Sequence, residues 1–138
     1  MNNEFYTFKG YQLHEKYALT ISMEDYLEMI FRMSVGEVRV NELAKNLNVR
    51  PSSASKMVDN LRAGGYIDFE KYGVIVLTEK GKQAGEYLLH RHEILHEFLC
   101  LINNSDNELE QVEKIEHFIN ENTLLNIEKL IVRLKGEC

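Results

Sequence analysis

The sequence predicts a mainly α-helical fold with one small β-hairpin, on the strength of three observations. Apolar residues recur at helical spacing along most of the 138-residue chain. The chain contains a single proline, so few helices are expected to be interrupted. One stretch, residues 66–78, is instead rich in β-branched and aromatic residues, with Gly73 inside it. The length allows one domain or two small domains that share a core.

Charge divides the chain into two parts. Residues 20–82 carry nine acids and nine bases, so this segment is neutral. Residues 83–138 carry eleven acids and five bases and hold the whole net charge of −6. We therefore expect a charge-balanced domain over 21–80 and an acidic helical domain over 81–138, with residues 1–20 as an N-terminal extension.

The first two helices are expected from capping and periodicity. Ser22 and Asp25 form a capping-box pattern, and apolar residues then recur at helical spacing as far as Met33. We therefore expect the first helix to begin at Ser22. Asn41 is expected to cap a short second helix over 42–47.

A third helix and a hairpin complete the front half. Pro51 is a favourable first helical residue, and Gly64 provides a stop signal. Two β-rich runs, 66–70 and 74–78, flank the turn at Gly73 and predict a β-hairpin. Helix, short helix, turn, helix and hairpin is the order of a winged helix-turn-helix domain.

The back half is expected to be helical throughout. Thr78 can cap a long helix over 79–102, and a polar loop follows it. Two further helices are expected over 108–120 and 123–135. The buried stripe of the long helix is expected to comprise Leu88, Leu95, Leu99 and Ile102.

The outward face of the third helix suits DNA. Its small hydroxyls and its lysine fit contacts with grooves and phosphates, whereas Asp59 on the same face opposes them. The tip of the hairpin offers a further cation and an aromatic ring. An ordinary solvated face and a plain turn are the alternatives. The candidate DNA-binding residues are Arg50, Ser52, Ser53, Ser55, Lys56, Lys71 and Tyr72.

The stretch HEILH, residues 92–96, matches the H-E-x-x-H motif of zinc proteases. In that motif both histidines bind zinc and the glutamate is the general base. On the expected helix, however, His92 lies close to the apolar stripe, His96 lies further out and Glu93 further still. A protease also needs a third zinc ligand and a substrate cleft. We expect only His92 to bind metal, with a small zinc hydrolase as the alternative.

Two further groups of metal-binding residue types occur at helical spacing. Asp25 and Glu28 lie three residues apart on the first helix. Glu113, Glu116 and His117 lie three and four residues apart on the helix after the loop. Each group occupies one side of its helix beside an apolar stripe, so it can face a neighbouring element. The alternatives are a capping role for Asp25 and solvated surface acids elsewhere.

Five segments resemble the diphtheria toxin repressor family and follow in the family's order over roughly residues 21–119. The resemblance implies a homodimeric, metal-activated transcriptional repressor with a winged helix-turn-helix domain and a helical dimerisation domain. Carboxylates at positions 25 and 113 resemble the manganese branch of the family. The segments are SMEDYLEMIF, VRPSSASKMVDNL, EKYGVIVLTEKGK, HRHEILHEFL and VEKIEHF. The metal ligands that the resemblance implies are Asp25, Glu28, His92, Glu113, Glu116 and His117.

This set of ligands contains four carboxylates, two imidazoles and no thiolate. Such hard donors suit Mn²⁺ or Fe²⁺, and Co²⁺ or Zn²⁺ can substitute. Two divalent ions per chain would balance the four carboxylate charges. The resemblance implies a Mn²⁺-responsive repressor of metal-uptake genes. A repressor of the same fold that responds to Fe²⁺ or Zn²⁺ is the alternative.

The expected partners are double-stranded operator DNA and a second copy of the chain. No membrane is expected, because no run approaches the roughly 18–20 apolar residues of a membrane span. No small organic substrate is expected either. Cys100 and Cys138 lie in no metal or redox spacing, and the first residues lack a secretory apolar segment. The expected location is therefore the cytoplasm.

Overall fold

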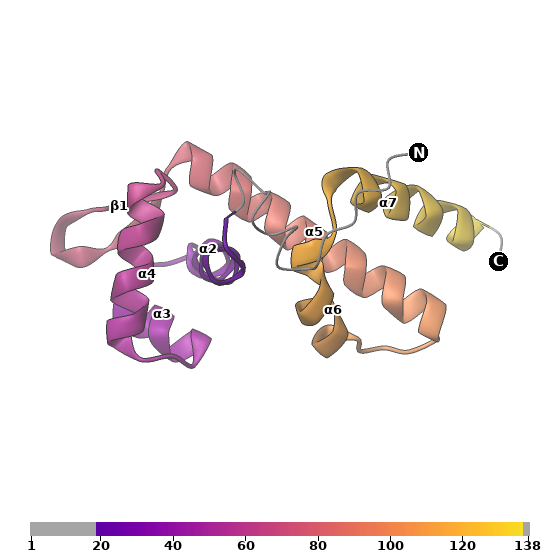
Figure 1. Ribbon diagram of the computed structural model, residues 1–138, viewed down its shortest axis with the longest axis horizontal. Coiled ribbons are helices and arrows are strands. Elements are labelled where there is room, and N and C mark those ends of the chain that lie inside the picture. The colour runs from indigo at the N-terminus through magenta and orange to yellow at the C-terminus, as the bar shows by residue number, and fades with distance from the viewer. Residues whose placement is uncertain (1–18, 137–138) are drawn as a thin grey trace, which may run out of the picture.

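The computed structural model describes residues 19–136, so most of the expected N-terminal extension and Cys138 lie outside the described residues. The described part is mainly helical and contains one two-stranded antiparallel hairpin, as predicted. Helices α2, α3 and α4 and the hairpin lie at one end, α6 and α7 lie at the other, and α5 runs through both (Figure 1). Within this part, every helix is too short or too polar to cross a membrane.

The first two helices begin earlier than predicted. Helix α2 spans Ile21–Met33, and the hydroxyl of Thr20 accepts a hydrogen bond from the Met23 N–H at 3.1 Å. Thr20, not Ser22, is therefore the N-cap, because its backbone is extended and its oxygen reaches the third amide. Helix α3 spans Val40–Leu47 and follows Arg39, so the expected cap at Asn41 was also wrong.

The third helix and the hairpin match the prediction. Helix α4 spans Pro51–Ala63, and the Gly64 N–H closes its last turn on the Asn60 carbonyl at 3.0 Å. Strands β1 (Ile67–Phe69) and β2 (Ile75–Leu77) pair antiparallel. A 3₁₀ turn, η1 (Lys71–Gly73), forms the tip. The core of this half includes Leu27, Ile30, Val38, Leu43, Ala54, Val58, Leu61, Ile67, Ile75 and Leu88.

Helix α5 spans Glu79–Asn103 and is capped by Thr78, whose hydroxyl accepts from the Gly81 N–H at 3.1 Å, as predicted. Two glycines allow it to pack closely. A Cβ at Gly81 would lie 1.9 Å from the Tyr66 carbonyl oxygen, and one at Gly85 would lie 2.7 Å from the Phe31 Cβ. The absence of these side chains lets α5 lie directly against the hairpin and α2.

The helix expected over 108–120 is broken. Helix α6 ends at Ile115 (Leu109–Ile115), and a 3₁₀ turn, η2 (Glu116–Phe118), precedes α7 (Glu121–Gly136). Ile102 is 54% exposed, so its expected place on the buried stripe of α5 was wrong. The second core comprises Leu95, Leu99, Val112 and Leu124.

Candidate metal centre

Two groups of three potential metal ligands meet where α2, α5 and η2 come together. One group contains Asp25, Glu116 and His117, and the other contains Glu28, His92 and Glu116. Within each group, one ligand atom from each residue lies within 4.8 Å of the others. Glu116 belongs to both groups. The structure therefore brings together five of the six residues predicted as metal ligands.

The sixth residue, Glu113, lies at the edge of this arrangement. It is exposed and lines a pocket of about 430 Å³ together with Asp25, Glu28, His92 and Glu116, but it belongs to neither group of three. The 3₁₀ turn buries Glu116, which is 3% exposed, while Glu113 stays on the solvent side of α6.

The second group has strong internal electrostatic interactions. Nδ1 of His92 lies 2.8 Å from Oε2 of Glu116, and this hydrogen bond raises the pKa of His92 against the opposing effect of burial. Burial and then the charge of Glu116 raise the pKa of Glu28. The guanidinium of Arg32 donates to Glu28 at 3.1 and 2.8 Å and opposes that shift. Two close carboxylates thus repel each other, which favours a bound cation.

His117 presents its two nitrogens to two different acids on α2. Nε2 lies 3.2 Å from Oδ1 of Asp25, and Nδ1 lies 2.7 Å from Oε1 of Glu24. These two hydrogen bonds, the one to Asp25 first, raise the pKa of His117 to about 9 despite burial. Arg91 donates to both oxygens of Glu24, at 3.3 and 3.2 Å.

Sequence reasoning missed Glu24 and Arg91. They are 67 positions apart, and no local spacing links them. The available signals were two charged residues beside predicted ligands, with Glu24 preceding Asp25 and Arg91 preceding His92. A charged neighbour of a ligand is common on helices, so this signal was weak.

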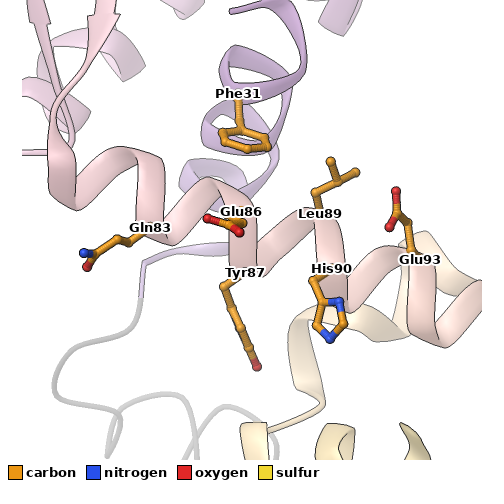
Figure 2. A pocket seen from close by; sticks show the side chains of 7 residues that line it. All are labelled: Phe31, Gln83, Glu86, Tyr87, Leu89, His90 and Glu93. Carbon is orange, nitrogen blue, oxygen red and sulfur yellow. The ribbon is translucent and has the colours of Figure 1, made fainter.

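The three polar side chains of the HEILH stretch point to three different places. His92 meets Glu116, whereas Nε2 of His96 accepts from the Glu108 N–H at 3.2 Å and lies 3.6 Å from the Cys100 sulfur. Glu93 is exposed and lines a separate pocket (Figure 2). The arrangement of an H-E-x-x-H zinc site, with both histidines on one ion, is absent from residues 92–96.

The side chains predicted to contact DNA are exposed, and they lie just before α4, on α4 and at the hairpin tip. Lys71 and Tyr72 lie at the hairpin tip, where Tyr72 is 89% exposed and has a positive φ of 64°. The guanidinium of Arg39 donates to the Tyr72 carbonyl and connects the tip to the start of α3. Asp59 is exposed as well. The exposed candidates before the hairpin are Arg50, Ser52, Ser53, Ser55 and Lys56.

Comparison with known proteins matches both halves of the chain to domains of one protein family. Residues 18–75 match the family model described as iron dependent repressor, N-terminal DNA binding domain. Residues 78–136 match the iron dependent repressor, metal binding and dimerisation domain. The chain belongs to the iron dependent repressor family. This membership confirms the predicted resemblance and makes the chain a metal-dependent, DNA-binding repressor with a winged helix-turn-helix domain.

Relatives within the iron dependent repressor family are similar over most of the chain. The HTH-type transcriptional regulator MntR of Oceanobacillus iheyensis is 46% identical over 121 residues, which cover 86% of this chain and 82% of the relative. The protein of the same name from Bacillus subtilis (strain 168) is 42% identical over 115 residues, which cover 81% of each chain.

Solved structures support the same fold for this repressor. The manganese regulator SloR has a TM-score of 0.71 and 25% identity, over 79% of this chain and 53% of that one. A manganese-dependent transcriptional repressor in complex with manganese has a TM-score of 0.68 and 25% identity, over 79% of this chain and 52% of that one. This chain therefore spans about half the length of these solved structures.

Proposed function

We propose that this repressor responds to Mn²⁺ and that up to two ions bind between its two domains. The proposed ligands are Asp25, Glu28, His92, Glu113, Glu116 and His117. The single observation that carries the proposal is the position of Glu116, which belongs to both groups of potential ligands. A carboxylate has two oxygens, so one buried side chain can bridge two neighbouring ions.

The donor set fits a hard divalent cation. The two groups supply only carboxylate oxygens and imidazole nitrogens, and the thiol of Cys100 lies beside His96, outside both. Mn²⁺ and Fe²⁺ favour such donors. The relatives named MntR and the manganese regulator SloR favour Mn²⁺. Fe²⁺ is the specific alternative, because the matching family is described as iron dependent.

The site connects the parts of the chain that perform the two tasks. Asp25 and Glu28 belong to α2 of the DNA-binding half, whereas His92 on α5 and Glu116 on η2 belong to the other half. Cations held by these residues would supply positive charge between the two halves. The ligands on α2 would then hold α2, and with it α4, in one orientation relative to the dimerisation domain.

The DNA-binding half offers exposed groups that suit contacts with an operator. The hydroxyls of Ser52, Ser53 and Ser55 and the amine of Lys56 suit the major groove and its phosphates. Arg50 precedes α4, and the hairpin tip adds Lys71 and Tyr72 as candidates for backbone contacts. We infer that double-stranded operator DNA of metal-uptake genes is the partner, and that a cytoplasmic homodimer without a small organic substrate binds it.

Exposed apolar residues on α7 support the proposed homodimer. Leu125 is 50% exposed and Val132 is 71% exposed, and both line a groove of about 370 Å³ with Ile94 of α5. A second copy that covers this face would bury these side chains. Analytical ultracentrifugation, which measures the mass of the assembly in solution, tests this part of the proposal on the wild-type chain and on Val132→Glu.

Fluorescence anisotropy of a labelled duplex from this gene's own upstream region tests the main proposal. Chelated protein and protein with Mn²⁺ are compared at one salt concentration, and about a tenfold gain in affinity with Mn²⁺ supports it. Equal binding in both states would instead assign the metal a structural role. Glu93→Gln distinguishes the hydrolase alternative from the repressor. It removes the general base of the H-E-x-x-H motif, so it would abolish hydrolysis, but it leaves the repressor's proposed ligands intact.

A further inference from the structure

Glu24 lies next to the proposed ligands but belongs to neither of the two ligand groups. Oε1 of Glu24 lies 2.7 Å from Nδ1 of His117, on the edge of the ring away from Asp25. The opposite nitrogen, Nε2, lies 3.2 Å from Oδ1 of Asp25. Two adjacent residues of α2 therefore contact the two nitrogens of a single imidazole.

The contacts of Glu24 determine which atom carries the proton in the hydrogen bond between Glu24 and His117. Arg91 donates to both oxygens of Glu24, at 3.3 and 3.2 Å, so both oxygens act as hydrogen-bond acceptors. The proton in the 2.7 Å contact therefore belongs to Nδ1 of His117. Nη2 of Arg91 also lies 3.5 Å from that Nδ1, so the two donors share one carboxylate oxygen. Nε2 is left as the nitrogen that can bind an ion.

Arg91 fixes Glu24 from the other domain. Its side chain is buried, at 3% exposure, and its Nε has no hydrogen-bond partner within residues 19–136. The charge of this buried guanidinium is balanced chiefly by Glu24. Arg91 directly precedes His92 on α5, so one helical turn supplies both a proposed ligand and the residue that holds Glu24.

We propose that Glu24 is a positioning residue of the metal centre: it accepts the Nδ1–H of His117 and directs Nε2 toward Asp25, while Arg91 holds Glu24 in place. The inference rests on the proposed function, because it assumes that His117 binds metal. Carboxylates that accept the second N–H of a metal-binding histidine fix its tautomer and ring orientation, and their loss typically costs about 10–100-fold in metal affinity.

Mn²⁺ affinity, measured from the electron paramagnetic resonance signal of free Mn²⁺, gives the first test. Glu24→Ala is expected to weaken binding by about 10–100-fold, and Glu24→Gln by less, because its amide oxygen still accepts the Nδ1–H. The matched control is Glu128→Gln. It removes an acid that lies 2.7 Å from another imidazole, that of His90, away from the metal centre, and it is expected to stay within about twofold of wild type.

A spectroscopic measurement separates positioning from a general loss of structure. In ¹⁵N-histidine-labelled protein loaded with diamagnetic Zn²⁺, the Nδ1–H of His117 is expected to exchange slowly with water. Glu24→Ala is expected to speed this exchange, and Glu24→Gln is expected to preserve it in part. Equal loss of affinity in both variants with an unchanged Nδ1–H signal would overturn the positioning role, because a purely structural Glu24 would behave in that way.

His117→Ala distinguishes failure of this inference from failure of the proposed function. If His117→Ala weakens Mn²⁺ binding by about tenfold or more while Glu24→Ala stays within about twofold of wild type, the inference is overturned and the metal site stands. If His117→Ala also leaves the affinity unchanged, both are overturned.

Discussion

The carboxylate of Glu116 lies 2.8 Å from Nδ1 of His92, so a buried acid on η2 meets a buried imidazole on α5. The same carboxylate completes a second group of potential ligands with Asp25 and His117. This shared position makes the members of the two groups unequal in the effect that their mutation is expected to have. Loss of Glu116 affects both, whereas loss of a residue on α2 affects one.

Metal stoichiometry follows from this arrangement. Asp25→Ala and Glu28→Ala are each expected to lower the number of bound Mn²⁺ ions by about one, because each removes a ligand from a single group. Glu116→Gln is expected to weaken both sites. Equilibrium dialysis followed by elemental analysis measures the bound metal. Full loading of the Glu116→Gln variant would contradict the bridging role.

Mn²⁺ affinity is expected to rise with pH. In the metal-free chain the contacts with Asp25 and Glu24 raise the pKa of His117 to about 9, so its imidazole is protonated at neutral pH. Binding through Nε2 must release that proton, and His92, whose pKa is also raised, adds to the effect. Calorimetry in buffers of different ionisation enthalpy is expected to detect about one released proton from His117 at pH 7.5. A pH-independent affinity would contradict this account.

The same proton stabilises the metal-free fold. The pKa of His117 in the folded state lies above its ordinary value of 6.5, so its contribution is complete below about pH 6.5 and is lost as the pH rises through about 9. In chelator, the free energy of unfolding is expected to fall by at most about 3 kcal/mol over this interval. Urea unfolding measures the change. His117→Gln is expected to flatten the profile, and an unchanged slope would disprove the assignment.

Lys56 is expected to contribute a phosphate contact. It is exposed on α4 beside the serine hydroxyls, so Lys56→Ala is expected to weaken DNA binding at all sequences alike. The slope of log affinity against log salt concentration is expected to fall by about 1. Lys129→Ala, on α7, is the control that changes the same charge in the other domain. Equal salt slopes for both variants would remove Lys56 from the DNA surface.

Arg39 is expected to act on DNA through the hairpin tip. Its guanidinium donates to the carbonyl of Tyr72, a residue whose positive φ is uncommon for a large side chain. Arg39→Ala frees the tip, so DNA affinity is expected to fall by about threefold to tenfold while Mn²⁺ affinity stays unchanged. Anisotropy and paramagnetic resonance measure the two quantities. Unchanged DNA affinity would show that the tip needs no such support.

The front half of the fold was predictable because its signals are local. Pro51 and Gly64 mark the two ends of α4, and Thr78 caps α5. The errors at Ser22 and Asn41 are errors of one or two residues, because several residues near a helix start can cap it and backbone geometry selects one. The side chain of Thr20 occupies that position in α2.

The candidate metal centre was predictable only in part. Helical spacing indicated that Asp25 and Glu28 lie on one side of α2, although the structure places them in different groups of potential ligands. The apolar stripe of α5 favoured His92 over His96, and His92 belongs to one of the groups. Glu116 is buried in the 3₁₀ turn that follows α6, and neither glycine nor proline marks that turn. The roles inferred for Glu24 and Arg91 depend on contacts between distant segments, which local patterns do not encode.

Reciprocal linkage gives the most direct test of the central claim, that metal bound between the domains controls DNA binding. If Mn²⁺ strengthens DNA binding, then an operator duplex must strengthen Mn²⁺ binding by the same factor. The measurement is Mn²⁺ affinity with and without saturating duplex at one salt concentration. We predict about tenfold or tighter Mn²⁺ binding with the duplex, abolished in Glu116→Gln. The same Mn²⁺ affinity with and without the duplex would contradict the account.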